Sequence, residues 1–418
     1  MLANKVRVLL LVGLLGASGL GLAQGSGRLC APMLANTSAM LALGQSAVIL
    51  QLPATPANGQ QSAPDPQVTP PVPAEPQLAP APKRAPIRIA LMLPLRSESL
   101  GKAAEAVREG FLTAFERDRD NITLDLIETG DSAQETLDSY AKAVDGHDVL
   151  VGPLARSAVS AIAASPVIYK PTVALNHPDS ARDIPLPQKL LVMGLSIEDE
   201  ARQVANWADS EQRTGRAVIV SGTASWQRRI AQAFANHWKR LGRVAELVEL
   251  TANNGYLGDA SMQQLKLKLD GEPPALLFGA LDAEQARQLR AVLGPTLPLY
   301  GTSSVNPGRT PVGTLAELDG LRLLDLPWQI QSDHPAVMVY PHPAQPTGSM
   351  DMERLYALGI DAFRVARELA LHPVGNFQMD GVTGRLTVSF GNGAASFERV
   401  EPVTTYQGGA YVAVPATH

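Results

Sequence analysis

Serine and lysine residues with the spacing of an acylating serine enzyme are the first candidates for chemistry in this chain. Ser139-Tyr140-Ala141-Lys142 fits the S-x-x-K pattern, and Ser304-Val305-Asn306 resembles the S-D-N motif that accompanies it. The third motif, K-T-G, is represented only by Lys170-Pro171-Thr172, which comes too early in the chain. The segment 301–305 also fails the nucleophile-elbow pattern, which needs glycine where Val305 stands. The serines therefore do not indicate an acyl-transfer enzyme.

Metal, cofactor and nucleic-acid sites are not indicated either. The 7 histidines show no H-E-x-x-H spacing, and no G-x-x-x-x-G-K-[ST] phosphate loop occurs. The single cysteine, Cys30, excludes an intramolecular disulfide and a cysteine-rich zinc site. With 35 basic and 40 acidic residues the net charge is −5, which argues against a nucleic-acid partner. We expect a protein that is not an enzyme and has no metal or cofactor.

Polar residues that follow predicted strands are the better candidates, because ligands of parallel sheets bind beyond the carboxyl ends of the strands. The alternative is that these residues form turns and helix caps. An unknown small ligand in a cleft would meet the following residues: Arg96, Ser97, Ser99, Gly152, Pro153, Asn176, His177, Ser221, Trp226, Ser303 and Ser304.

The elements that must position these residues alternate between strand and helix. The apolar run 87–93 predicts a strand, and the spacing of Ala103, Val107, Phe111 and Ala114 predicts a helix after it. The alternation continues to residue 175, and it restarts with a helix-capping pattern at 196–199. The sequence thus predicts an α/β protein with two parallel-sheet lobes and crossovers between them. We expect lobe 1 to comprise 87–195 with 302–372, and lobe 2 to comprise 196–301 with 373–418.

The first 86 residues have a different composition from the rest. Residues 1–23 combine Lys5 and Arg7 with an apolar run and small residues at the end, as a signal peptide does. Residues 24–52 carry Cys30, and Arg28 occupies a position where a lipidation site needs a small residue. Of the 33 prolines, 11 lie in 53–86, which predicts a disordered, extended linker.

Several segments of the α/β part resemble a known family. They lie in the same order as in that family and cover roughly 87 to 400: 89–95 (IALMLPL), 106–111 (AVREGF), 151–154 (VGPL), 173–176 (VALN), 196–203 (SIEDEARQ), 226–229 (WQRR), 300–303 (YGTS), 325–328 (DLPW), 354–362 (RLYALGIDA) and 381–386 (GVTGRL). The chain resembles the penicillin-binding protein activators of the LppC/LpoA family. The opening is shared with amino-acid-binding proteins, whereas DLPW and LGIDA are more specific.

The resemblance implies a bilobed fold like that of type I periplasmic binding proteins and a role without catalysis. The family stimulates a bifunctional peptidoglycan synthase from the outer membrane, so the implied partner is a penicillin-binding protein, and the implied location is the periplasm with possible outer-membrane association. Residues 24–86 leave no room for the helical-repeat domain of longer members, and the residues before Cys30 depart from the lipoprotein pattern. The alternative function is a solute-binding protein of an amino-acid-type ABC transporter.

Overall fold

A computed structural model describes residues 85–179, 186–211, 215–343 and 349–414. The expected signal peptide (1–23), the segment 24–52 with Cys30, and nearly all of the expected linker 53–86 lie outside the described residues. Within the described ranges, no helix combines the length and the apolar character needed to cross a lipid bilayer.

Lobe 1 is built on a parallel sheet whose first strand, β1, lies inside the sheet and is hydrophobic on both faces. The sheet has the order β2-β1-β3-β4-β5 and consists of β1 (Ile87–Leu93), β2 (Ile122–Glu128), β3 (Val149–Val151), β4 (Thr172–Ala174) and β5 (Leu190–Val192). Residues 89–93 are fully or almost fully buried, as is typical of strands covered by helices on both sides. The helices between these strands are α1 (Gly101–Asp118), α2 (Ala133–Ala143) and α3 (Arg156–Ala163).

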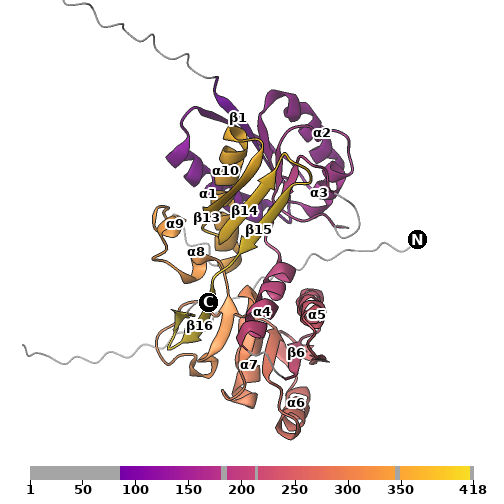
Figure 1. The fold of residues 1–418 in the computed structure, drawn as a ribbon, viewed down its shortest axis with the longest axis vertical. Helices are drawn as coiled ribbons and strands as arrows, with labels where there is room; N and C mark the ends of the chain where they lie inside the picture. Colours follow the sequence, from indigo (N-terminus) through magenta and orange to yellow (C-terminus); the bar gives the residue numbers. More distant parts are fainter. Residues whose placement is uncertain (1–84, 180–185, 212–214, 344–348, 415–418) are drawn as a thin grey trace, which may run out of the picture. The chain divides into compact units, whose positions relative to one another are not determined.

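Helix α10 (Met350–Leu371) comes from far along the chain and packs against α1 in the core of lobe 1 (Figure 1). The two helices approach closely at two glycines: a Cβ on Gly110 would overlap the carbonyl of Tyr356, and a Cβ on Gly359 would overlap the carbonyl of Val107. Phe111 and Phe363 meet edge to face beside this contact, with ring centroids 5.4 Å apart.

Lobe 2 is built on a mixed sheet of seven strands with the order β17-β16-β12-β11-β10-β6-β7. The parallel strands are β6 (Ala217–Ser221), β7 (Ala245–Glu249), β10 (Leu276–Ala280), β11 (Leu299–Gly301) and β12 (Leu321–Leu324), and the antiparallel ones are β16 (Val403–Gln407) and β17 (Ala410–Ala413). The covering helices are α4 (Ile197–Glu211), α5 (Ser225–Arg240), α6 (Asp259–Gly271) and α7 (Ala283–Leu293), and a small hairpin joins β8 (Ala252–Asn253) to β9 (Tyr256–Leu257).

Two segments differ from the expected lobe boundaries. Strand β12, which was expected in lobe 1, pairs with β11 and β16 in the sheet of lobe 2. The antiparallel sheet of β13 (Gly375–Asp380), β14 (Arg385–Phe390) and β15 (Ser396–Val400) was expected in lobe 2 but packs on lobe 1 (Figure 1). The reason is the alternation in β14, where Leu386, Val388 and Phe390 point into the same core as α1 and α10. The residues before β12 also pack on lobe 2, because Val305 and Leu318 belong to its core. The expected boundaries are therefore wrong for 302–324 and for 375–400.

The chain consequently passes between the lobes three times. The first crossover, 193–196, leads from β5 to α4, and the second, 325–326, leads from β12 to α8 (Pro327–Ile330), which precedes α9 (Pro335–Met338). The third crossover, 401–402, leads from β15 to β16. The predicted α/β architecture with two sheets and crossovers is confirmed.

Candidate functional site at the lobe junction

The polar residues after β1 are engaged in local interactions of lobe 1. Ser97 accepts a hydrogen bond from Leu100 N at 2.8 Å just before α1, and it donates to Asp131. Ser99 lies 3.3 Å from the Ser97 hydroxyl. Arg96 pairs with Glu135 of α2 and donates to the carbonyl of Glu128 at 3.0 Å. These contacts match turn and capping chemistry.

The candidates after β3 and β4 lie in two loops that are joined to each other by a hydrogen bond. Asn176 donates through Nδ2 to the carbonyl of Leu154 at 3.1 Å and accepts from the backbone N–H of His177 at 2.9 Å. Gly152, with φ of 109°, lies against Met92, where a side chain would not fit, and Pro153 follows it. His177 is the exception, because its imidazole has no hydrogen-bond partner among the described residues and faces a cavity.

The candidates of lobe 2 are also distributed over separate places. Ser221 ends β6 fully buried, and its hydroxyl has no hydrogen-bond partner within the described part of the chain. Trp226, the second residue of α5, packs against the core of lobe 2. Ser304 donates to the carbonyl of Leu281 at 2.7 Å, and Ser303 belongs to the junction described next. Across the described residues, no hydrogen bond joins a candidate of lobe 1 to one of lobe 2.

The densest polar cluster of the structure lies instead at the crossovers. Arg354 of α10 binds Asp325, the first residue of the second crossover, through Nε–Oδ1 at 3.0 Å and Nη2–Oδ2 at 2.6 Å. The same guanidinium donates to the carbonyl of Ser303 at 3.1 Å and to Asp351 at 2.7 Å. Asp325 is fully buried and also accepts from Asn306 Nδ2 at 2.7 Å. A helix of lobe 1 is therefore fixed to the chain that leaves lobe 2.

Helix α4 contacts the same cluster from the other lobe. Its Glu200 accepts a hydrogen bond from the backbone N–H of Ser303 at 2.9 Å. One turn further along α4, Gln203 accepts from the backbone N–H of Glu401 at 3.0 Å, which attaches the third crossover to this helix.

Arg399 of β15 fixes the first crossover. It donates to the carbonyls of Gly194 and Met193, each at 3.0 Å, and to the hydroxyl of Thr383 at 3.1 Å. Thr383 in turn donates through its hydroxyl and its backbone N–H to Asp361 of α10, at 2.7 and 2.8 Å. A continuous chain of hydrogen bonds thus runs from the first crossover through β15 and the β13–β14 turn to α10.

Burial dominates the electrostatics of this junction. It raises the pKa of Glu200 to about 7, with the Ser303 hydrogen bonds opposing the shift, and it raises the pKa of Glu401 well above the usual range. Burial lowers the pKa of Arg399. For Arg354 burial acts in the same direction, but the charge and hydrogen bonds of Asp325 outweigh it and raise the pKa. These shifts come from burial and from contacts within the fold.

A cavity of about 300 Å³ opens beside the junction, between β15, α4 and the end of β4. Its lining is mostly polar and comprises His177, Val192, Gly194, Ser196, Asp199, Arg202, Gln203, Asn206, His237, Phe397, Glu398, Arg399, Val400 and Glu401. His177 is the one predicted candidate in this lining. Nowhere in the described ranges do three or more histidine, cysteine, aspartate or glutamate residues form a group that could hold a metal ion.

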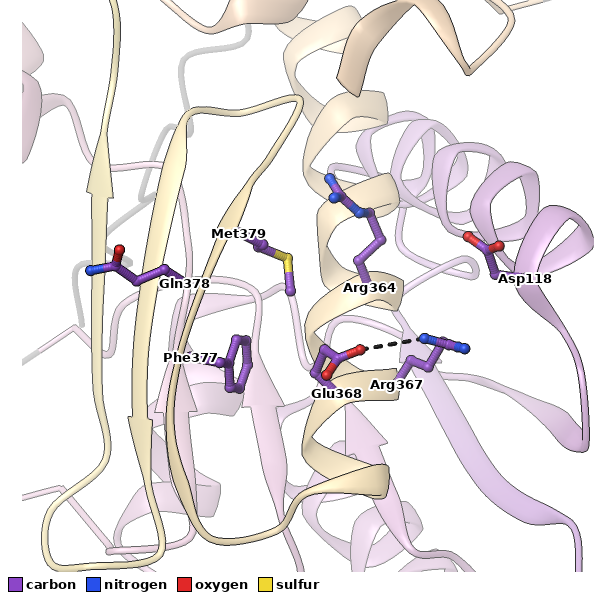
Figure 2. Close-up of a pocket in the computed structure, with 7 residues that line it drawn as sticks. All are labelled: Asp118, Arg364, Arg367, Glu368, Phe377, Gln378 and Met379. Carbon is purple, nitrogen blue, oxygen red and sulfur yellow. Dashed lines mark hydrogen bonds and ion pairs between the residues drawn. The ribbon is translucent and has the colours of Figure 1, made fainter. Parts of the chain in front are cut away.

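A second hollow of about 350 Å³ lies on lobe 1, between the end of α1, α10 and β13 (Figure 2). Figure 2 shows Phe377 and Met379 on the side of β13 that faces α10, and the ion pair between Arg367 and Glu368. The remaining lining residues are Asp118, Arg364 and Gln378.

Ser303 is the predicted site residue that lies at the junction. Its partners there were not predicted, although the sequence carried a signal for them. Glu200, Ser303, Asp325, Arg354 and Asp361 all lie in the segments that carry the family resemblance. The structure brings these separate segments together at the crossovers.

The profile of the family described as "LppC putative lipoprotein" matches residues 51–270 and 274–395. The chain belongs to this family.

Curated relatives of this LppC-family chain carry a functional name. "Penicillin-binding protein activator LpoA" of Haemophilus ducreyi is 25% identical over 315 residues, which cover 71% of this chain and 50% of the relative. The protein of the same name from Vibrio cholerae is 27% identical over 350 residues, 72% of this chain and 54% of the relative. The chain spans about half the length of the curated relatives it matches.

Solved structures confirm the fold. The LpoA C-domain of Haemophilus influenzae, described as a regulator of PBP1A, superposes with a TM-score of 0.62 at 24% identity over 78% of this chain and 99% of that one. A "putative branched-chain amino acid ABC transporter" from Chromobacterium violaceum superposes with a TM-score of 0.63 at 34% identity, over 77% of this chain and all of that one. The expected fold of the type I periplasmic binding proteins is therefore confirmed for the LppC-family chain.

Proposed function

We propose that this chain is a non-enzymatic activator of a penicillin-binding protein, namely a bifunctional peptidoglycan synthase, and that it regulates cell-wall synthesis. The observation that carries the proposal is the family match over 51–395, together with relatives that are named activators of penicillin-binding proteins. The partner is then a protein, and the activity resides in that partner.

Arg96, Ser97 and Asn176, which follow strands of lobe 1, already have partners within the fold, and this supports the proposal over solute capture. A receptor for an amino acid presents free donors and acceptors to the ligand's ammonium and carboxylate groups. Here Ser97 is used by Leu100 and Asp131, Arg96 by Glu135, and Asn176 by Leu154. A ligand would have to break these contacts before it could bind to the same groups.

The place of action that we propose is the periplasm, with association to the outer membrane. The family is described as one of lipoproteins, and the sequence has one cysteine, Cys30, near an apolar N-terminal segment. Mass spectrometry of the protein isolated from cell membranes tests whether Cys30 is lipidated.

The test is reconstitution with the bifunctional synthase from the same organism. Glycan polymerisation from a lipid-linked precursor is followed with synthase alone, with this chain alone, and with both. We expect co-elution of the two proteins, a faster reaction in the mixture, and no polymer from this chain alone. A matched control is the Chromobacterium violaceum protein, which shares the fold. Absence of both binding and stimulation would refute the proposal.

The second candidate function is a solute-binding protein of an amino-acid-type ABC transporter. It is favoured by the 34% identity to the whole of the Chromobacterium violaceum structure. A thermal-shift screen of the common amino acids separates the two functions, with small-angle scattering to follow lobe closure. If the chain is an activator, we expect no amino acid to raise its Tm in a saturable way. An amino acid that raises Tm and closes the lobes would establish the solute-binding function.

A further inference from the structure

Two buried glutamates from different parts of the chain meet at the lobe junction. Glu200 and Glu401 are 5% and 6% exposed. The backbone of Glu401 is held by Gln203, which lies three residues after Glu200 and so on the same face of α4. The third crossover is therefore attached to α4 within one turn of Glu200, whose carboxylate accepts from the backbone of Ser303.

The hydrogen bonds at the pair are incomplete for two ionised carboxylates. Glu200 accepts from Ser303 N at 2.9 Å, whereas the buried Oε2 of Glu401 has no hydrogen-bond partner in the described part of the chain. An ionised carboxylate is an acceptor only, and a buried charged acceptor without a donor is destabilising. A proton on one of the two glutamates converts it into a donor and removes this cost.

The neighbouring arginines do not form ion pairs with either glutamate. Arg354 directs its donors to Asp325, Asp351 and the Ser303 carbonyl. Arg399 directs its donors to two main-chain carbonyls and Thr383. Two ionised glutamates would therefore repel each other in a buried place without a direct counterion.

We propose that Glu200 and Glu401 share one proton, and that the pair is a pH-sensitive latch that holds the third crossover against α4. With the proton, the two side chains are compatible and the crossover stays packed. Without it, two like charges face each other and the contact between α4 and residues 400–402 opens. This inference does not depend on the proposed partner.

Burial raises the pKa of both glutamates, and the charge of Glu200 adds to the rise at Glu401, which agrees with this geometry. Other charged or titratable groups surround the pair on every side. At the junction they are Asp325, Arg354 and Arg399. The cavity beside α4 adds His177, Asp199, Arg202, His237 and Glu398, and another cavity lined by Glu401 adds His334, Asp380 and Arg385.

Amide hydrogen exchange of the full chain at pH 5 to 8, corrected for intrinsic exchange, tests the latch in peptides that cover 197–205 and 398–405. A proton held only in the closed state makes the opening equilibrium constant rise up to about tenfold per pH unit. We expect a rise of at least about tenfold in the wild type and a nearly flat profile in Glu401→Gln, which mimics the protonated acid. Glu200→Gln should flatten the profile in the same way.

The matched control is Glu398→Gln. Glu398 is an exposed neighbour in the same cavity lining, and its variant should keep the wild-type rise.

A wild-type profile that is already flat, or Gln variants that keep the wild-type rise, would overturn the latch. If a variant fails to fold, ¹³C NMR of wild-type protein labelled at the glutamate carboxyl carbons gives the answer. Two glutamate signals that titrate well above pH 4.5 support the pair, and titration of every glutamate signal at ordinary values refutes it.

Discussion

Arg354 and Asp325 form a two-point contact that joins a helix of lobe 1 to the crossover leaving lobe 2. Both N–O distances are short, at 3.0 and 2.6 Å, and the aspartate is fully buried. A planar guanidinium matched to a carboxylate fixes orientation as well as distance. The contact therefore sets how the second crossover enters lobe 1.

Removal of Arg354 should be costly because it leaves Asp325 buried and uncompensated. We expect Arg354→Met to lower the free energy of unfolding by about 3–5 kcal/mol in urea denaturation. The double variant Arg354→Met/Asp325→Leu should recover most of that loss, since no buried charge remains. The control is Arg156→Met, which breaks the exposed pair with Asp179 and should cost less than about 1 kcal/mol. Equal losses in the two single variants would contradict the argument.

The helix contact of lobe 1 should not tolerate even one methyl group. At Gly110 and at Gly359 a new Cβ meets the main chain of the opposite helix, which cannot rotate away. Each glycine-to-alanine change should cost at least about 1–3 kcal/mol, seen as a lower urea midpoint. Gly271→Ala at the end of α6 is the matched control, because its Cβ meets nothing within 4 Å and should be neutral or slightly stabilising. A neutral Gly359→Ala variant would show that α1 and α10 can separate without cost.

Asp361 of α10 should determine the position of the β13–β14 turn. It accepts from the N–H groups of Val382 and Thr383 and from the Thr383 hydroxyl, and it pairs with Arg364. Asp361→Asn replaces one acceptor oxygen by a donor that faces other donors, so we expect a loss of about 1.5–3 kcal/mol. Asp380→Asn, with an exposed side chain on the same sheet, should stay within about 0.5 kcal/mol. Urea denaturation of the two variants checks both values.

Local sequence patterns were sufficient to predict most elements of the fold. The run 87–93 and the stripe of Val107, Phe111 and Ala114 gave the correct strand and helix because burial follows their periodicity. Ser196 caps α4 as its pattern predicted, accepting from Asp199 N at 3.1 Å. Local pattern could not assign β13–β15 to a lobe, because a half-buried alternating strand fits any apolar face of the right size.

The junction could not be predicted because its residues look like surface residues in the sequence. Glu200 stands in an acidic first turn of α4, where glutamates normally face water and favour the helix dipole. Its burial follows from the third crossover and from Ser303, which lie 201 and 103 residues further along the chain. The same holds for Arg354, whose partner Asp325 directly follows β12, a strand of the other lobe.

His177 gives a pH dependence of opposite sign to that of the glutamate pair. Burial lowers the pKa of His177 below its usual 6.5, so below that value the unfolded chain binds a proton that the folded chain resists. Stability should therefore be full above about pH 6.5 and fall as the pH drops. His177→Asn should reduce this fall between pH 6.5 and 5, measured by Tm relative to wild type. The exposed His372→Asn serves as the control, and an identical fall in His177→Asn and wild type would contradict the prediction.

The pairing of α1 with α10 also determines when the protein can fold during synthesis. Residues 101–118 find their partner only when residues 350–371 have been made, after all the parallel strands of lobe 2. Such distant pairing is slow, because a long loop must close before the contact forms. Until α10 emerges, a nascent chain carries Val107 and Phe111 without the surface that covers them, and it is open to chaperones and proteases at that face.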